Sequence, residues 1–128
     1  MSENVPQDLK YAKSHEWVRR EGAMATIGIT DHAQHELTDV VFVELPAVGR
    51  KLKAGESCAV VESVKTASDI YAPVGGEVIA VNADLAHHPE TVNTAPYAGG
   101  WFFKIQMSDP AELDRLMTPE SYTKQITP

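Results

Sequence analysis

The sequence reverses direction at Lys65. Residues 58–64 and residues 67–72 are both β-prone, and the two runs meet at this lysine. Strands in globular proteins usually span about five or six residues, so no single strand of ordinary length could run through both. We therefore expect an antiparallel hairpin with Lys65 at its tip.

A two-residue loop of Lys65 and Thr66 gives this hairpin a self-consistent register, because apolar residues then face apolar residues and hydroxyls face hydroxyls. The expected cross-strand pairs are Val64–Ala67, Ser63–Ser68, Glu62–Asp69, Val61–Ile70 and Val60–Tyr71. Tight hairpins prefer Asn-Gly or Asp-Gly, whose residues tolerate positive φ, and facing acids destabilise a ladder. Departures from local rules concentrate at functional or strained positions, which makes Lys65 a candidate functional residue. The alternative interpretation is an ordinary exposed lysine in a loop.

Short β-prone segments recur along the chain. They lie at residues 16–20, 23–29, 40–45, 77–81 and 101–107, in addition to the hairpin. Residues 40–45 are almost continuously apolar, which predicts a strand covered on both faces. Several short strands separated by turns predict a compact antiparallel barrel or sandwich.

Short helices are expected around these strands. Thr30 is suited to cap a helix over residues 31–37. Asp109 and Glu112 resemble a capping box at the start of residues 108–128, which also carry helical spacing of apolar side chains. We expect the C-terminal helices to cover one end of the β-rich core.

The length of 128 residues predicts one domain, residues 1–128. It divides into a loosely held polar tail at residues 1–10, a β-rich core at 11–107 and a helical cap at 108–128. Eighteen acidic and eleven basic residues give a net charge of −7, which disfavours nucleic acid and anionic membranes as partners. The acidic surface is suited to contact basic patches on other proteins.

The single cysteine, Cys58, excludes an internal disulfide and lies in an apolar run, where we expect a small buried side chain rather than a nucleophile. No apolar run approaches the roughly 20 residues of a membrane span. The first ten residues lack the features of a secretion signal or an organelle presequence. If Met1 is the native start, the expected location is the bacterial cytoplasm; the mitochondrial matrix would require a presequence that has been removed.

Three kinds of catalytic site are disfavoured. His32 and His35 lie three apart, but no Cys-x-x-Cys or His-Glu-x-x-His spacing accompanies them, so no metal site is expected. Ser14, His15 and Glu16 are adjacent, and neighbours on a strand alternate faces, so they would not form a nucleophile and its base. The paired glycines are not followed by helix starts, which argues against a phosphate-binding loop.

Blocks of sequence spread over nearly the whole chain match one known pattern. The hairpin reads ESVKT followed by SDIYAP, and further blocks lie at residues 11–18, 28–34, 41–46, 76–78, 96–97, 99–101 and 108–113. In this order and spacing they resemble the H-protein family of the glycine cleavage system, with Lys65 at the lipoyl-attachment position.

The resemblance implies a mainly β fold, a flattened barrel–sandwich hybrid of the lipoyl-domain kind, with a short helix after the first hairpin and C-terminal helices. It implies lipoic acid attached covalently to Lys65 at an exposed tip. The chain would then be a monomeric, non-catalytic carrier whose lipoyl arm brings chemistry to other enzymes.

The resemblance also implies the partners. A pyridoxal-phosphate glycine decarboxylase would load an aminomethyl group onto the arm, and an aminomethyltransferase would pass its carbon to tetrahydrofolate. Dihydrolipoamide dehydrogenase would reoxidise the dithiol, and lipoate-attaching enzymes would modify Lys65.

In the family the loaded arm folds back into a cleft on the carrier. Ser14 and Glu16 match positions that line this cleft, and Glu62 and Asp69 are the carboxylates nearest to Lys65 in sequence. Carboxylates suit the cationic amine of the loaded arm. Glu36 stands where some members have a histidine.

Three alternatives remain open at this point. A lipoyl domain of a 2-oxoacid dehydrogenase usually ends sooner than this chain, which adds residues 108–128. An H-like protein could instead relay lipoyl groups to other acceptors, and an unmodified β-rich interaction module would need no cofactor. A biotin acceptor usually has methionines beside its lysine, whereas Val64 and Thr66 flank Lys65.

Overall fold

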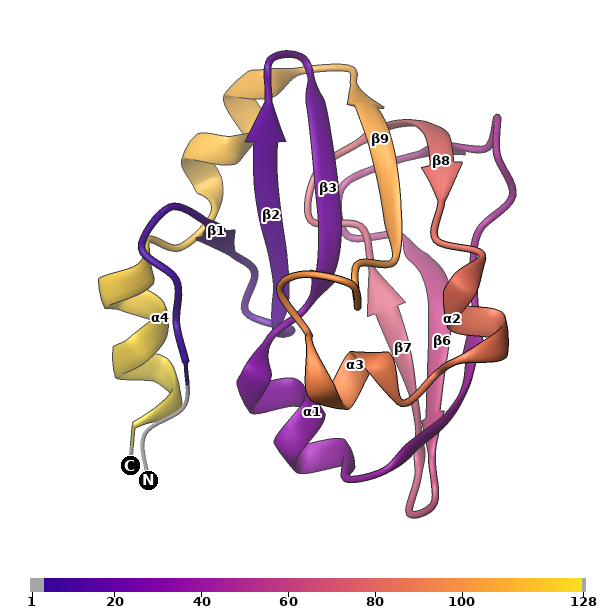
Figure 1. Cartoon of the computed structure of the whole chain (residues 1–128). Coiled ribbons are helices and arrows are strands. Elements are labelled where there is room, and N and C mark those ends of the chain that lie inside the picture. The colour runs from indigo at the N-terminus through magenta and orange to yellow at the C-terminus, as the bar shows by residue number, and fades with distance from the viewer. Residues whose placement is uncertain (1–3, 128) are drawn as a thin grey trace.

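In the computed structural model, which describes residues 4–127, the strands form two antiparallel sheets that are not closed into a barrel (Figure 1). The larger sheet has the order β1-β2-β3-β9-β8-β5, and the smaller has the order β4-β6-β7. The strands are β1 (Lys10–Tyr11), β2 (Glu16–Glu21), β3 (Met24–Ile29), β4 (Val40–Glu44), β5 (Lys51–Leu52), β6 (Ser57–Ser63), β7 (Ala67–Tyr71), β8 (Gly76–Val81) and β9 (Phe103–Met107). The helices are α1 (Asp31–Leu37), α2 (Asp84–His87), α3 (Thr91–Thr94), α4 (Pro119–Ile126) and the 3-10 helix η1 (Pro110–Arg115).

One hydrophobic core lies between the two sheets. Ile27 and Phe103 of the larger sheet belong to the same buried cluster as Val43, Val61 and Ile70 of the smaller sheet. Burial of this apolar area is the main favourable contribution to folding. The mainly β architecture predicted from the sequence is therefore confirmed.

A second apolar cluster joins the two ends of the chain to the larger sheet. Tyr122 of α4 stacks on Tyr11 of β1 with ring centroids 4.6 Å apart, and Trp17 and Leu9 are buried beside them. Helix α4 accordingly lies next to β1 (Figure 1). The helical segment at the C-terminus thus covers one part of the larger sheet.

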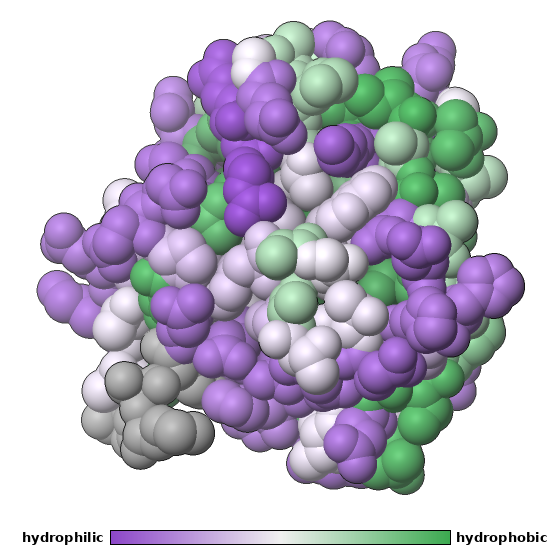
Figure 2. Space-filling view, in the orientation of Figure 1, coloured by the Kyte–Doolittle hydropathy of each residue, from purple (hydrophilic) through white to green (hydrophobic). Residues whose placement is uncertain are grey.

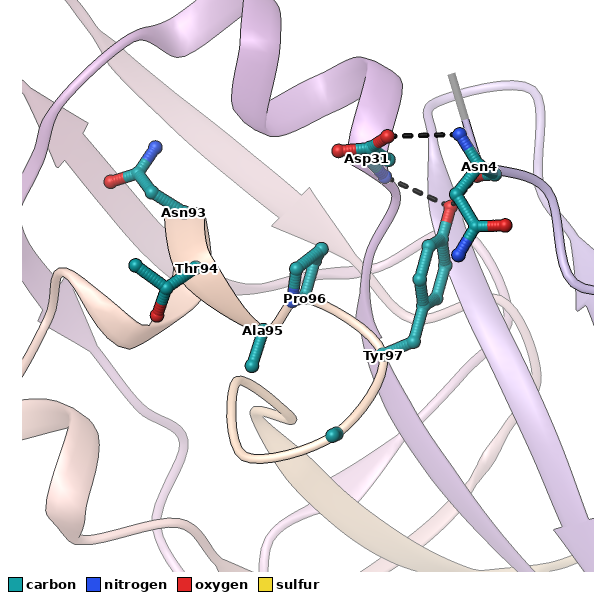
Figure 3. Close-up of a pocket in the computed structure, with 8 residues that line it drawn as sticks. Asn4, Asp31, Asn93, Thr94, Ala95, Pro96 and Tyr97 are labelled. Carbon is teal, nitrogen blue, oxygen red and sulfur yellow. Dashed lines mark hydrogen bonds between the residues drawn. The ribbon is translucent and has the colours of Figure 1, made fainter. Parts of the chain in front are cut away.

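The prediction of a loosely held tail up to residue 10 is wrong for residues 4–10, while residues 1–3 lie outside the described residues. Leu9 is 2% exposed. Asn4 donates its backbone N–H to the Asp31 carboxylate at 2.9 Å, and the Tyr97 hydroxyl donates to the Asn4 carbonyl at 2.7 Å. Figure 3 shows these three residues at one edge of a hollow, with the Asp31 N–H also donating to the Tyr97 hydroxyl. Apolar burial and this hydrogen-bonded group hold the segment.

Helix α1 follows the sequence prediction at both bounds. Its N-cap, Thr30, accepts a hydrogen bond from the backbone N–H of Ala33. Thr38 closes the helix with a φ of 63°, which is uncommon for a residue other than glycine. Asn93 donates its side-chain amide to the Thr38 carbonyl at 2.8 Å, so α3 helps to hold this conformation.

The capping box expected at residue 109 forms only in part. Asp109 accepts from the N–H of Ala111, as a cap should. The Glu112 carboxylate instead accepts from the N–H of Gly75 at 2.8 Å. This tertiary bond ties η1 to the turn before β8.

Strand β4 is not covered on both faces, contrary to the prediction. Val41 is 53% exposed and Phe42 is 48% exposed. Strand β4 is an edge of the smaller sheet, and its register with β6 shifts between Val40 and Phe42, which turns extra side chains outward. Figure 2 shows hydrophobic surface along the lower right edge, beside the tip of the β6–β7 hairpin.

Candidate functional site

Lys65 lies at the exposed tip of the hairpin formed by β6 and β7. The reversal predicted at this residue is confirmed, but the predicted register is wrong. Glu62 pairs with Ala67, and Val60 pairs with Asp69, so Glu62 and Asp69 do not face one another. The partner of Ala67 is Glu62 rather than Val64, and three residues, 64–66, separate the two strands instead of the expected two.

The Ser63 side chain explains the longer loop. Its hydroxyl oxygen accepts from the backbone N–H of Thr66 at 3.1 Å and lies 3.3 Å from the backbone nitrogen of Lys65. The backbone N–H of Ser63 also donates to the Thr66 carbonyl at 2.7 Å. Serine hydroxyls can replace backbone groups as turn partners in this way. Lys65 and Thr66 therefore need no positive φ, and the apparent mismatch with tight-hairpin rules disappears.

A cleft of about 130 Å³ lies between the turn at Ser14, helix α1 and strands β6 and β7. Its walls are apolar, with Leu37 and Ile70 among them. Its polar lining includes Ser14, Glu36 and Asp69. An arrangement of this kind can hold an alkyl chain that ends in a cation.

Glu16 does not line this cleft but holds Ser14, which does. Its side chain is fully buried; Ser14 donates its hydroxyl to the carboxylate, and the backbone N–H of Tyr71 donates to it at 3.0 Å. Burial raises the pKa of Glu16 above its ordinary value of 4.5, and the two hydrogen bonds oppose that rise. The carboxylate thus joins β2 of the larger sheet to β7 of the smaller sheet.

The structure brings together three of the five predicted site residues. Ser14 and Asp69 line the cleft and Glu16 holds Ser14, whereas Lys65 stands at the hairpin tip. Glu62 does not line the cleft: it is exposed and alternates with the buried Val61, so its side chain points to the outer face of the smaller sheet.

The sequence did not reveal the part that His15 plays in the cleft. His15 lines it with a backbone φ of 76°, and it contacts Tyr122 from the far end of the chain. Local sequence patterns do not predict a left-handed backbone at a histidine, nor a contact between residues 107 positions apart.

Among the residues that the structure describes, neither Cys58 nor a cluster of metal-ligating side chains forms a second site. Cys58 is buried, its thiol donates to the Ile70 carbonyl at 3.5 Å, and burial raises its pKa to about 12; the expected buried position is confirmed, and the raised pKa disfavours the thiolate form. Within residues 4–127, no three His, Cys, Asp or Glu side chains gather in a way that could hold a metal ion. None of the described helices is both long and apolar enough to cross a membrane.

Comparison with known proteins gives one consistent result. The sequence pattern of the family described as Glycine cleavage H-protein matches residues 9–128. The glycine cleavage system H protein of Pseudoalteromonas translucida is 58% identical, covering 96% of each chain, and that of Neisseria meningitidis is 57% identical, covering 98% of this chain and 99% of the relative. The crystal structure of a glycine cleavage system H protein from Mycobacterium marinum superposes with a TM-score of 0.86 at 40% identity, covering 94% of this chain and 98% of that one.

The raised pKa of Glu16 predicts a pH dependence of stability. Between 4.5 and its higher folded value, Glu16 binds more protons in the folded than in the unfolded chain, so the free energy of unfolding falls as pH rises through that window. Each unit of upward shift corresponds to about 1.4 kcal/mol. Glu16→Gln cannot ionise and should remove this fall, so the variant gains stability relative to the parent as pH rises.

Urea unfolding from about pH 4 to about pH 8 measures this difference. Glu62→Gln, which removes an exposed carboxylate, is the control. Parallel pH curves for the parent and Glu16→Gln would show that Glu16 is not held in a desolvated site.

Proposed function

The chain belongs to the glycine cleavage H-protein family, whose members carry a lipoyl group, and we propose that Lys65 is its attachment site. The observation that carries this proposal is the position of Lys65 at the exposed tip of the β6–β7 hairpin. An attaching enzyme can approach the amine there from several sides. The 2-oxoacid dehydrogenase, relay and unmodified-module alternatives are not favoured by whole-chain similarity to H proteins.

The residues around the hairpin and the cleft fit a lipoyl group. When bound, that group supplies the redox and one-carbon transfer chemistry. The chain itself acts as a carrier rather than an enzyme. Ser63 fixes the turn that presents Lys65, and a tether on Lys65 raises the effective concentration at a docked partner to as much as roughly millimolar.

The residues of the cleft would hold the end of a loaded arm. Its apolar walls exclude water from an alkyl chain, and the carboxylates of Asp69 and Glu36 attract a terminal ammonium. Ser14 is held by the buried carboxylate of Glu16, so its hydroxyl has a defined position at the cleft. Retention of the cargo between partners follows from these contacts.

The partners are the other components of the glycine cleavage system. These are glycine decarboxylase, aminomethyltransferase and dihydrolipoamide dehydrogenase, together with the lipoate-attaching enzymes. Support comes from family membership and from the outer face of the smaller sheet, where Phe42, Glu44 and Glu62 are exposed near the hairpin. The similar proteins of bacteria support a location in the bacterial cytoplasm.

Lys65→Arg tests the attachment site. Arginine keeps the positive charge and, at an exposed position, should change the free energy of unfolding by less than about 0.5 kcal/mol. Its guanidinium does not lose a proton to become a nucleophile, so no lipoyl group should be attached. Glycine-dependent reduction of the nicotinamide cofactor, measured with the three partner enzymes, should fall to background.

Lys53→Arg, a change at another exposed lysine, is the matched control and should retain parental activity. Parental activity in Lys65→Arg would refute the assignment.

Asp69→Asn and Glu62→Gln separate the cleft from the outer face. Both changes remove one exposed carboxylate from the same hairpin, but only Asp69 lines the cleft. Both variants should accept lipoate normally. The lifetime of the loaded arm, followed by ammonia release without aminomethyltransferase, should shorten roughly three- to tenfold in Asp69→Asn and stay unchanged in Glu62→Gln. Equal lifetimes in the two variants would remove Asp69 from the site.

A further inference from the structure

Helix α4 reaches two walls of the cleft through one buried hydroxyl. The Oη atom of Tyr122 lies 2.8 Å from Nδ1 of His15 and 2.6 Å from Oγ1 of Thr30. His15 lines the cleft beside Ser14, and Thr30 caps α1, whose residues form the facing wall. Tyr122 is fully buried, so these bonds are made away from competing water.

The three side chains can form a continuous chain of hydrogen bonds. Thr30 Oγ1 accepts from the N–H of Ala33 at 3.2 Å, which leaves its own proton available for Tyr122 Oη. Tyr122 can then donate to His15 Nδ1, with the imidazole proton on Nε2. If His15 donates instead, Tyr122 donates to Thr30. Either order links the turn at His15 to the first turn of α1.

The backbone of His15 depends on its surroundings. Its φ of 76° lies in the left-handed region, and residues held there persist only where several contacts determine them. The N–H of Thr30 donates to the His15 carbonyl at 3.0 Å, and the N–H of His15 donates to the Ala12 carbonyl at 3.0 Å. The bond to Tyr122 adds the side-chain restraint. This turn sets where the Ser14 hydroxyl meets the Glu16 carboxylate.

We propose that Tyr122 is a positioning residue, which holds the Ser14–Glu16 turn and helix α1 at the spacing that the loaded arm requires. The inference rests on the proposed function of the cleft. It gives residues 108–128, which a bare lipoyl domain lacks, a role beyond covering the core. The hydroxyl performs this role, since the ring alone would suffice for packing.

Tyr11 offers a matched control within the same structure. Its ring stacks on that of Tyr122 with an interplanar angle of 9°, so both rings pack in one cluster. The Tyr11 hydroxyl donates to the Pro6 carbonyl at 2.6 Å, and neither Tyr11 nor Pro6 lines the cleft. Tyr11→Phe and Tyr122→Phe therefore each remove one hydroxyl from the same stack, and only the second touches the cleft walls.

The first test uses nitrogen-15 NMR of the protein without lipoate. Tyr122→Phe should shift the ring nitrogens of His15 and the amide signals of Ser14, Glu16 and Ala33. Tyr11→Phe should leave these signals at their parental positions. The same shifts in both variants, or none in Tyr122→Phe, would overturn the inference.

The second test uses lipoylated protein loaded from glycine. The lifetime of the loaded arm should be roughly two- to tenfold shorter in Tyr122→Phe, the factor expected for one hydrogen bond, and parental in Tyr11→Phe. A parental lifetime in Tyr122→Phe overturns the inference while the proposed function stands. Failure of the parent to be lipoylated overturns the proposed function, and the NMR comparison still decides the role of Tyr122.

Should Tyr122→Phe fail to fold, two changes at Thr30 carry the same comparison. Thr30→Ser keeps the hydroxyl and should give the parental His15 signals and lifetime. Thr30→Val removes it and should give the shifted His15 ring signals; its lifetime is not compared, because the variant also loses the N-cap of α1. Identical behaviour of the two variants would overturn the inference.

Discussion

The buried carboxylate of Glu16 joins the two sheets at the point where the cleft forms. It accepts from the Ser14 hydroxyl on its own side and from the Tyr71 N–H on the other sheet. A carboxylate without partners in such a position would be strongly destabilising, so these hydrogen bonds offset the desolvation that raises its pKa. The edge of β7, the turn at Ser14 and the walls of the cleft all depend on this one group.

The hairpin and the cleft have different roles in the proposed carrier function. The hairpin places Lys65 in solvent, where partner enzymes can reach it, and the cleft lies between β7 and α1 on the same chain. Strand β7 belongs to both, because it leads from the lysine loop to Asp69 and Ile70 at the cleft. Under the proposed function, an arm attached at the tip would have an exposed attachment point and a cleft to enter on the same chain.

Much of this architecture could be predicted from the sequence because it depends on local patterns. Apolar alternation located most of the strands, and Thr30 marked the start of α1. The family resemblance pointed to Lys65 and Ser14, and nearness to Lys65 in the sequence pointed to Asp69. The hairpin register failed because the pairing rules omit a serine side chain that replaces backbone turn contacts. That one error also placed Glu62 opposite Asp69.

Features that depend on distant contacts could not be predicted. Phe42 is exposed because it lies with Glu62 on the outer face of the smaller sheet, and no pattern within residues 40–45 shows which face the other sheet covers. The burial of Leu9 requires the tyrosine stack that α4 completes. The left-handed backbone of His15 is held by contacts that include Tyr122, which also contacts Thr30, and these residues lie far from His15 in the sequence.

Intact mass measurement with peptide mapping, on protein made in cells that can supply lipoate, tests the central claim most directly. The account predicts a mass increase of one lipoyl group and its location on the peptide that contains Lys65. An unmodified chain, or a lipoyl group on any other lysine, would contradict it.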